Sequence, residues 1–481
     1  MIPALLIGFI ASVALSAIGL AARLLARVPF PAEKLYNWAT YQLGTPAMFQ
    51  LVHKIFGFGE GGKIFAFVGV LFAWVGGLTL LGLVPPLIAG LVVAVISLLF
   101  VNPLWALVYG LLYIGLRYAL TPVQTDPQRR GVLNTLSLAS LGLFGAGVAG
   151  ALRPLFTSST KTNTITSGAG NSGKVNLPEG ITSQDDFYYV SINNEALDPR
   201  IAEKDWKLTV DGLVNTPQKF ALSDLKTGFK PVDLELTMCC ISNPIGGDLI
   251  GNAIWSGLKF KDLLDKVGVQ AGAKWVTWEA EDGFYESIAL REALEQDVML
   301  AYHMNGEPLN SKHGFPLRVL IPGRFGMKQP RWLTKITLTA EEKPGYWANR
   351  GWSKTAFIAP LSRIDYPSRG LVFKPGEIVK ARGIAAAGNK QITKVEVSTN
   401  GGDTWLEATL QPKRSKWAWT QWTLDWTAEA GTADLGDIKS GRQFIVRCYA
   451  DGVVQASEER DSLPEAASGL HRLTVSVPSK A

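Results

Sequence analysis

The sequence contains few cysteines: three in 481 residues, of which Cys239 and Cys240 are adjacent. A structural zinc site takes four ligands that are usually spaced in pairs, and no Cys or His residues here have that spacing. A thioredoxin-like site requires C-x-x-C, which is also absent. These absences exclude zinc-finger and dithiol-redox proteins, so the adjacent pair requires a different explanation.

Charged residues are absent from a long stretch: residues 64–116 contain no Asp, Glu, Lys or Arg. A soluble fold rarely leaves such a length uncharged, whereas a helix that spans a membrane needs about 20 apolar residues. The sequence therefore predicts an N-terminal bundle of transmembrane helices. Asn102-Pro103 can split the longest run, so we expect four helices, or five if that split occurs. The expected apolar segments are residues 2–25, 64–84, 87–116 and 131–151.

The distribution of basic residues predicts the orientation of these helices. Lys and Arg are concentrated after the first segment and before the last one, and cytoplasmic loops carry such an excess. Four helices with the N-terminus outside place both basic loops in the cytoplasm, whereas five place one of them outside. In both cases the chain after the last helix lies outside, which predicts a multi-pass protein of the cell membrane with a large extracytoplasmic part. The basic residues are Arg23, Arg27, Lys34, Lys54, Lys63, Arg117, Arg129 and Arg130.

The sequence "QRRGVLN" at residues 128–134 has two interpretations. Arg129 and Arg130 before an apolar stretch resemble a twin-arginine export signal, which carries an already folded domain across the membrane. The same two arginines are also compatible with an ordinary cytoplasmic anchor that obeys the positive-inside rule. A cofactor that must be loaded before export would favour the first interpretation.

Beyond residue 155 the composition changes twice. Residues 156–180 are rich in Ser, Thr, Gly and Asn without apolar periodicity, which predicts a flexible linker. Mixed α/β patterns follow, and the C-terminal part is all β: in "KVEVSTNGGDTWLEATL", Val395 and Val397 alternate with polar residues before a turn. We therefore expect an immunoglobulin-like β-sandwich at the C-terminus. The expected domains are a transmembrane domain at residues 1–155, a linker at 156–180, an α+β domain at 181–362 and the β-sandwich at 363–481.

The adjacent cysteines follow a predicted strand, "VDLELTM", in which Leu234, Leu236 and Met238 alternate with polar neighbours. Successive side chains of a strand point to opposite faces, so one cysteine can enter the core while the other points to the strand end. A single thiolate there, followed by a Gly-rich turn, suits a soft metal whose other ligands come from a cofactor. Two simply buried cysteines, or a strained disulfide between neighbours, are equally compatible with these residues.

Two segments resemble the sulfite oxidase family of molybdenum enzymes, and the resemblance extends over residues 187–477. "TMCCISN" is similar to the family's T-L-x-C-x-x-N. Cys240 takes the position that binds molybdenum carried by a pterin dithiolene, and Cys239 takes the variable position. "AYHMNGEPLNSKHGFPLRVLIPGRFGMKQPRWLTKITL" resembles a second family segment, A-Y-x-M-N-G-x-P-L…H-G-x-P-x-R…P-G-x-x-G-x-x-x-x-K-W-L. The resemblance implies one molybdenum–molybdopterin cofactor in a sulfite-oxidase-type domain, and a C-terminal domain of dimerisation type.

The second segment also makes chemical sense for binding an anion. A pterin phosphate needs several donors, and the segment offers basic residues beside Gly323 and Gly326, which permit close approach of the backbone. A solvated basic face is the alternative, although the Gly and Pro residues argue against a surface helix. "FYYVSINN" resembles the segment that opens the family's catalytic domain and lines the cofactor. The resemblance implies cofactor-binding roles for Tyr188, Tyr189, Asn193, His313, Arg318, Lys328 and Arg331.

The sequence departs from the sulfite-oxidising members where their arginines surround the substrate anion. Ser191 or Ile192 stands in place of one arginine, and Pro244 and Ile245 stand in place of another. A tyrosine expected in the family is replaced near Trp352. These changes remove positive charge, so we expect a neutral or less anionic substrate, such as an oxide, a sulfoxide or an organic molecule.

Histidines are also scarce. Only His53 of the four histidines precedes the linker, and a haem of the b type in a helix bundle generally takes two axial histidines. We therefore expect no haem in this chain. The helices are then an anchor, or a docking surface for a separate electron-transfer protein or a quinone-linked partner.

The predicted function is a membrane-anchored molybdopterin oxidoreductase that moves an oxygen atom or two electrons outside the cytoplasm, with Cys240 holding the metal. The substrate is an unidentified small molecule, a homodimer is compatible with the C-terminal domain, and nothing indicates nucleic-acid binding. Two alternatives are a sulfite dehydrogenase, with Arg324 or Arg350 as the substitute anion ligand, and a cofactor-free membrane-anchored binding protein.

Overall fold

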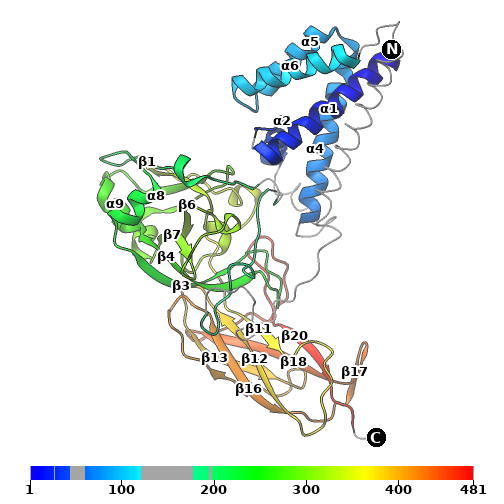
Figure 1. The fold of residues 1–481 in the computed structure, drawn as a ribbon. Helices are drawn as coiled ribbons and strands as arrows, with labels where there is room; N and C mark the ends of the chain where they lie inside the picture. The colour runs from blue at the N-terminus through cyan, green and yellow to red at the C-terminus, as the bar shows by residue number, and fades with distance from the viewer. Residues whose placement is uncertain are drawn as a thin grey trace. The chain divides into compact units, whose positions relative to one another are not determined.

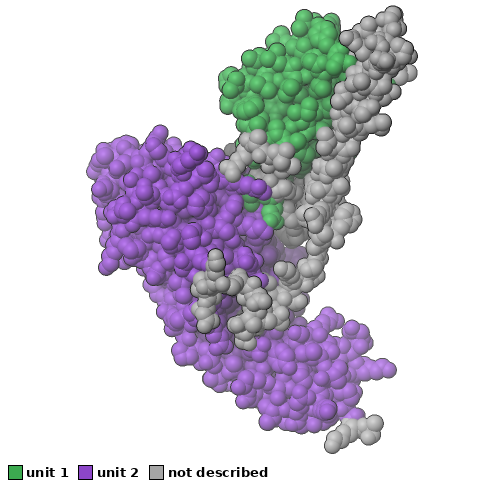
Figure 2. Space-filling view, viewed as in Figure 1, with its two compact units in different colours: residues 1–160, 191–198 green, residues 161–190, 199–481 purple. Residues whose placement is uncertain are grey.

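The computed structural model describes residues 2–26, 28–43, 60–120, 177–193, 195 and 198–479 of the chain. The chain divides into two units, residues 1–160 with 191–198, and residues 161–190 with 199–481 (Figure 2). Four features of the sequence lie outside the described residues. They are the twin-arginine sequence, the last apolar segment, His53 and the linker up to residue 176.

In the first unit, the described residues up to 120 are mainly helical. The apolar run at residues 87–116 is split, as Asn102-Pro103 allows, because α5 ends at Leu98 and α6 begins at Pro103. Proline suits the first turn of a helix, and the Asn102 side chain accepts a hydrogen bond from the backbone N–H of Trp105 at 3.1 Å. The described helices are α1 (Ile2–Ala26), α2 (Pro31–Leu43), α4 (Glu60–Leu80), α5 (Pro86–Leu98) and α6 (Pro103–Leu120), with a 3₁₀ turn at Leu81–Leu83 (Figure 1).

Close packing joins the helices of this unit. A Cβ added at Gly90 of α5 would lie 2.8 Å from the carbonyl oxygen of Gly110 in α6, so the two backbones can approach only because of the glycine. Arg117, buried near the end of α6, donates hydrogen bonds to the carbonyl oxygens of Gly82 and Val84, at 3.0 and 3.2 Å. These contacts satisfy carbonyls that follow α4 and have no helical partner.

Two helices of the described part are long and apolar enough to cross a membrane, judged by length and composition alone: Ala4–Arg23 within α1, and Pro103–Leu120, which is α6. Two further apolar helices are shorter, Phe67–Leu83 and Pro86–Leu98. Helices are therefore present in the predicted segments 2–25, 64–84 and 87–116, whereas the segment at 131–151 and a multi-pass membrane bundle stay predictions.

The second unit begins with an α+β domain that contains two sheets. In the first sheet, β1 runs parallel to β10 and antiparallel to β2, and β5 pairs with both β10 and β6. Three short helices contribute buried apolar residues to the same core as this sheet. The strands are β1 (Leu208–Gly212), β2 (Gln218–Phe220), β5 (Trp275–Ala280), β6 (Tyr285–Ala289) and β10 (Leu333–Thr339), and the helices are α8 (Leu222–Gly228), α9 (Phe260–Val267) and α10 (Leu290–Glu295).

The second sheet carries the adjacent cysteines. Its strand order is β3–β4–β7–β8, with β9 paired to β7, so β3 is an edge strand. The register between β3 and β4 pairs Cys239 with Ile250 and therefore places both cysteines at the C-terminal end of β3. The strands are β3 (Val232–Cys239), β4 (Ile250–Lys259), β7 (Met299–Met304), β8 (Glu307–Pro308) and β9 (Arg318–Leu320).

The C-terminal domain consists of two antiparallel sheets around one apolar core, in which Trp422 and Phe444 are completely buried. Cys448 is completely buried in β18, as expected for a core residue. The predicted β-rich domain is confirmed, while its immunoglobulin-like topology stays a prediction. One sheet contains β11 (Leu361–Tyr366), β12 (Ile378–Ala386), β15 (Thr409–Leu410) and β16 (Thr420–Thr427), and the other contains β13 (Ile392–Ser398), β14 (Leu406–Glu407), β17 (Ala433–Leu435), β18 (Ile438–Ala450), β19 (Val453–Val454) and β20 (Arg472–Ser476).

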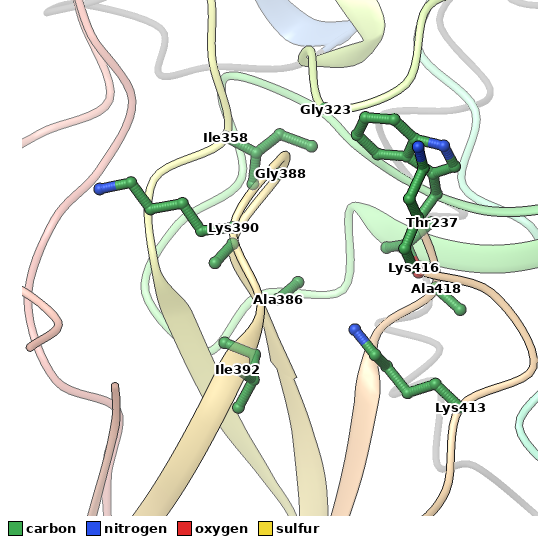
Figure 3. Close-up of a pocket in the computed structure, with 12 residues that line it drawn as sticks. Thr237, Gly323, Ile358, Ala386, Gly388, Lys390, Ile392, Lys413, Lys416 and Ala418 are labelled. Carbon is green, nitrogen blue, oxygen red and sulfur yellow. The ribbon is translucent and has the colours of Figure 1, made fainter. Parts of the chain in front are cut away.

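A small cavity lies where this β-sandwich meets the α+β domain (Figure 3). Thr237 and Gly323 line it from the α+β domain, and Ala386 and Lys413 line it from the sandwich. It has only about 10 Å³ of room for the centre of a water molecule, which is enough for about one water. The amino group of Lys413 donates a hydrogen bond to the side-chain oxygen of Gln391 at 2.8 Å. This cavity is therefore too small to be a substrate site.

Candidate active site

The adjacent cysteines have different surroundings at the end of β3. Cys239 is completely buried, and its Sγ donates to the carbonyl oxygen of Cys240 at 3.4 Å. Cys240 keeps 9% of its surface exposed, and its Sγ lies 3.1 Å from the hydroxyl of Ser242. The turn is closed by the backbone N–H of Asn243, which donates to the carbonyl oxygen of Cys240 at 3.1 Å. Neither cysteine takes part in a disulfide, so a disulfide between neighbours is excluded.

Burial raises the pKa of the Cys239 thiol well above its usual range, and the neighbouring Cys240 raises it further. Cys239 is therefore a protonated core thiol. Within the described parts of the chain, no group of three or more His, Cys, Asp and Glu residues is placed to hold a metal ion. A metal at Cys240 would accordingly need most of its ligands from a cofactor.

Arg318 is a buried cation on β9, a strand of the same sheet that carries the cysteines. Only 3% of the residue is exposed, and Nη1 donates to the carbonyl oxygen of His313 at 3.0 Å, whereas Nε has no hydrogen-bond partner. The guanidinium carbon lies 4.9 Å from the ring centroid of Trp255. Burial lowers the pKa of Arg318 to about 9, and the positive charge of Arg331 contributes to this shift. Among the described residues no carboxylate pairs with Arg318.

Arg331 forms the outer part of the same cationic group. Its Nη2 donates to the carbonyl oxygen of Val190 at 2.8 Å. Its guanidinium carbon lies 4.2 Å from the ring centroid of Trp332 and 4.8 Å from that of Tyr189. As with Arg318, no carboxylate in the described ranges neutralises it. Two arginines that share one region without an acidic partner among the described residues are suited to bind an anion.

His313 lies between these arginines and the start of the domain. Its Nε2 is 2.6 Å from the carbonyl oxygen of Gln184, and its backbone N–H donates to the side-chain oxygen of Asn310 at 2.9 Å. Burial lowers the pKa of His313 to about 3, and the nearby cations act in the same direction. The imidazole is therefore neutral at physiological pH. Since a carbonyl accepts from Nε2–H, the proton lies on Nε2 and Nδ1 is an acceptor.

The predicted tyrosines face different parts of the site. Tyr188 stacks on Phe187 at 5.3 Å between ring centroids. Burial raises the pKa of Tyr188 strongly, with Cys240 and Cys239 contributing, which places its hydroxyl on the cysteine side. Tyr189 instead lies under the guanidinium of Arg331, as described above. Asn193 is buried in the segment grouped with the first unit, where its backbone N–H donates to the hydroxyl of Ser191 at 3.2 Å.

Lys328 is separated from the cationic group. Its ammonium is buried and bonded to Glu286 of β6 at 2.7 Å, with the carbonyl oxygen of Ser287 at 3.4 Å. The structure therefore brings His313, Arg318 and Arg331 together but gives Lys328 a counter-ion of its own. Trp255 is completely buried, and its ring lies over the guanidinium of Arg318.

The C-terminal domain contributes two residues that the sequence did not reveal. Nη1 of Arg363 donates to the carbonyl oxygen of Gly247, at 2.8 Å, in the turn after Cys240. The ring of His471 packs against Gly246, where an added Cβ would lie 2.2 Å from Cδ2. Because both residues lie more than a hundred positions beyond the turn, no local pattern could have indicated these contacts. The small number of histidines in the chain, four, was the only sequence feature that could have drawn attention to His471.

The buried histidines predict a pH dependence of stability. The pKa values of His313 and His471 are lowered, mainly by burial, to about 3 and about 4. Below about pH 6.5 the unfolded chain protonates both, whereas the folded chain does not, so stability falls as the pH decreases. We expect a loss of about 1.4 kcal/mol per pH unit for each histidine between about pH 6 and pH 4. His471→Gln should remove one of these two contributions, as measured by denaturant unfolding of the detergent-solubilised protein. An unchanged pH slope in that variant would contradict the assignment.

Comparison with known proteins identifies the class. The family model described as oxidoreductase molybdopterin binding domain matches residues 195–347. The model described as Mo-co oxidoreductase dimerisation domain matches residues 361–440. These matches and the α+β fold define a molybdopterin-dependent oxidoreductase, which confirms the predicted class of enzyme.

The relatives specify the family. Sulfite oxidase from Arabidopsis thaliana is 30% identical over 273 residues, which are 44% of this chain and 69% of that protein. Sulfite oxidase from Gallus gallus is 28% identical, over 49% of this chain and 61% of that protein. The chain belongs to the sulfite oxidase family of molybdopterin-dependent oxidoreductases. This membership replaces the alternative of a cofactor-free binding protein.

Other relatives differ in reaction and in length. A nitrate reductase from Oryza sativa subsp. japonica is 27% identical over 54% of this chain, but the match spans only 34% of that longer protein. Among solved structures, the sulfane dehydrogenase SoxCD from Paracoccus pantotrophus has a TM-score of 0.54 at 22% identity, covering 62% of this chain and 81% of that chain. At this identity the likeness concerns the fold alone.

The residues present fit such a cofactor. The buried Nε of Arg318 lacks an acceptor, and the two unneutralised arginines match the phosphate of a pterin. A single thiol at a strand end matches a soft metal whose remaining ligands arrive with the cofactor. Neutral His313 offers Nδ1 to a donor group. The donor set is thus that of an anionic, metal-carrying group.

Proposed function

We propose that this protein is a membrane-anchored molybdenum–molybdopterin oxidoreductase that transfers an oxygen atom or two electrons with a small substrate outside the cytoplasm. Cys240 binds the molybdenum, Arg318 and Arg331 bind the pterin phosphate, and His313 accepts a hydrogen bond from the pterin. The observation that carries this proposal is the buried charge of Arg318, which has no acidic partner among the described residues. An anionic ligand would supply the missing counter-charge and accept a hydrogen bond from Nε.

The choice of Cys240 over Cys239 rests on geometry. Cys239 is completely buried and already donates to a backbone carbonyl, so binding a metal would require it to leave the core. Cys240 lies beyond the last residue of β3, keeps 9% of its surface exposed, and has a hydroxyl, that of Ser242, at 3.1 Å from its sulfur. A hydroxyl so close can donate to a thiolate and tune it.

The bound cofactor supplies the redox chemistry, and the chain supplies charge and position. Trp255 holds the guanidinium of Arg318 in place, and Gln184 fixes the tautomer of His313 so that Nδ1 can accept from the pterin. Tyr189 and Trp332 support Arg331 from its faces. We expect Asn193 to line the cofactor as well, by its place in the family segment. The contribution of Lys328 is indirect and is argued below.

The helical unit supports a multi-pass membrane anchor. Helices α5 and α6 expose many large apolar side chains, for which a lipid environment removes the cost of contact with water. The partly exposed Trp105 and the exposed Tyr118 lie near the two ends of α6, where aromatic residues favour the membrane interface. The exposed apolar residues, with their exposed fractions, are Leu87 61%, Leu91 64%, Leu98 48%, Leu104 67%, Leu107 55% and Leu111 57%.

Electrons then have to enter or leave through another molecule. No haem is proposed within this chain, so a separate electron-transfer protein or a quinone-linked partner would exchange electrons with the cofactor. The match to a dimerisation domain at residues 361–440 supports a homodimer formed through the C-terminal domain. The catalytic domain lies on the extracytoplasmic side in this proposal, because the basic residues flank the helices on the other side.

Export of a domain that carries its cofactor predicts a twin-arginine signal at Arg129 and Arg130. The double substitution R129K/R130K keeps the positive charge that orients the helices but removes the guanidinium pair that the export machinery reads. We expect the catalytic domain of this variant to stay in the cytoplasm, as measured by protease accessibility in spheroplasts. Normal delivery of the loaded domain would leave the arginines with a topological role only.

The substrate is proposed to be neutral or weakly charged. Arg324, one candidate for a substitute anion ligand, donates to the carboxylate of Glu292 and to the carbonyl oxygen of Thr355. Arg350, the other candidate, is buried and donates to the carbonyl oxygen of Tyr346 at 2.7 Å. Both are therefore engaged inside the protein, which disfavours the sulfite dehydrogenase alternative.

This charge balance predicts a substrate preference. Each missing arginine removes a charge-assisted hydrogen bond of about 1.5 to 3 kcal/mol, so two losses weaken binding of a dianion by a factor of hundreds or more. We expect very slow oxidation of sulfite with an artificial acceptor, and faster reduction of a neutral S-oxide or N-oxide with a reduced dye. Saturation by sulfite at micromolar concentration would overturn this preference and point to Arg324 or Arg350.

A further inference from the structure

The buried pair formed by Lys328 and Glu286 lies outside the cationic group, and the ammonium of Lys328 already has a carboxylate partner. The side chain of Lys328 is 3% exposed and that of Glu286 is completely buried, with 2.7 Å between Nζ and Oε1. The same Oε1 accepts from the backbone N–H of Ser287 at 2.8 Å, while Oε2 has no partner among the described residues. The backbone of Gly345 lies against the other side of the Glu286 carboxylate, because a Cβ added at Gly345 would overlap that carboxylate.

Lys328 ends a 3₁₀ turn, Gly326–Lys328, that touches the cysteine loop. A Cβ added at Gly326 would lie 2.5 Å from the hydroxyl of Tyr188 and 3.5 Å from the carbonyl oxygen of Cys239. The turn is held internally by the backbone N–H of Gln329, which donates to the carbonyl oxygen of Gly326 at 3.0 Å. One face of this turn thus lies close to the backbone of Cys239, the last residue of β3 and the neighbour of Cys240, and its last side chain is bonded to Glu286 of β6.

The energetics of buried ion pairs indicate that the pair of Lys328 and Glu286 fixes the position of the turn. A buried ion pair contributes little net stability compared with apolar residues of the same volume, because desolvation offsets the attraction. What such a pair supplies is a fixed geometry, since any displacement separates two charges in a medium of low polarity. Burial raises the pKa of the Glu286 carboxyl, and the ammonium of Lys328 opposes that shift.

We infer that Lys328 and Glu286 are positioning residues that fix the Gly326–Lys328 turn against Tyr188 and the backbone of Cys239, and thereby fix the thiol of Cys240. The inference rests on the proposed function for the identity of Cys240 as the molybdenum ligand. Its geometric part, the coupling of the pair to the cysteine loop, concerns the chain alone and can be measured with or without the metal.

The test compares the double variant E286Q/K328M with the wild-type protein and with Lys335→Met, all as full-length chains in detergent. The double variant removes both charges together, so its melting temperature should stay close to that of the wild type. Lys335→Met breaks the pair of Lys335 with Asp211, at 2.9 Å and half-exposed on the other sheet, and serves as the matched control.

Hydrogen exchange of the backbone amides is the first readout. In the double variant we expect exchange at least about tenfold faster in the peptides that contain Lys328 and Cys240, and unchanged exchange in the Lys335→Met control. In metal-loaded protein we also expect an altered Mo(V) electron paramagnetic resonance signal and a lower kcat at similar KM. If the double variant does not fold, Glu286→Asp, which keeps both charges but shortens the acid, should show the same pattern more weakly.

Unchanged exchange at the Cys240 peptide, in a folded variant, would overturn the inference and leave the pair as packing only. The molybdenum content of the wild-type protein separates this result from a failure of the proposed function. A wild-type chain without molybdenum contradicts the proposed cofactor, whereas the exchange data still decide whether the pair positions the loop.

Discussion

Cys240→Ser is expected to reduce activity by at least about 100-fold and to alter the molybdenum spectrum of whatever cofactor remains bound, because a hydroxyl is a hard, poor replacement for a thiolate. The substitution is nearly isosteric, and the position just after β3 tolerates a polar atom because its sulfur already lies 3.1 Å from the hydroxyl of Ser242. The fold should therefore be retained, as checked by the melting temperature and by tryptophan fluorescence. Activity with a reduced dye, normalised to molybdenum content, gives the effect.

Cys239→Ser is the matched control for this prediction. It changes the same atom in the neighbouring residue, but that side chain is completely buried and its sulfur donates to a backbone carbonyl. We expect a loss of stability of about 1 kcal/mol or more from placing a hydroxyl in the core, with activity largely retained. If instead Cys239→Ser abolishes activity and Cys240→Ser does not, the assignment of the ligand within the loop is displaced by one residue.

Arg318→Gln should have opposite effects on the empty and the loaded protein. Without the cofactor, Arg318 is a buried cation with no acidic partner in the described part of the chain, so its removal should raise stability by about 1 to 3 kcal/mol. With the cofactor, the same change removes a charge-assisted hydrogen bond of about 1.5 to 3 kcal/mol and should weaken cofactor binding by about ten- to a hundredfold. Melting temperatures of both forms, together with pterin content after dialysis, measure the two effects.

Arg324→Gln provides the comparison, because Arg324 is a similarly buried arginine that has a carboxylate partner, Glu292. Its removal breaks an ion pair, so we expect lower stability in both the empty and the loaded protein. If Arg318→Gln and Arg324→Gln change the stability of the empty and the loaded protein in the same way, the claim that Arg318 binds an anion is contradicted.

The parts of the site that share a short segment could be predicted from the sequence. The strand before Cys239 follows from strict alternation, and the helix break at Asn102-Pro103 follows from the conformational preferences of proline. The basic residues His313, Arg318 and Arg331 lie within one segment, so the family pattern identified them together. Each of these predictions depends on local chemistry that the chain displays within a few residues.

The remaining contacts depend on long-range packing. Lys328 belongs to the same basic segment, but its partner Glu286 is 42 positions away on another strand, so sequence spacing could not distinguish it from Arg331. Arg363 and His471 reach the turn after Cys240 only because the β-sandwich packs against the α+β domain. Helix α2 was not predicted either, because it contains charged residues and is therefore not an uninterrupted apolar run. One of these residues, Glu33, is buried and pairs with Arg23 of α1 at 2.6 Å.

The metal–sulfur shell is the most direct test of the central claim, that this chain holds molybdenum through Cys240. X-ray absorption at the molybdenum edge should be recorded on purified wild-type protein and on Cys240→Ser. The account predicts about one molybdenum per chain in the wild type, and one sulfur ligand fewer around the metal in the variant. A wild-type protein without molybdenum, or a variant with an unchanged sulfur shell, would contradict it.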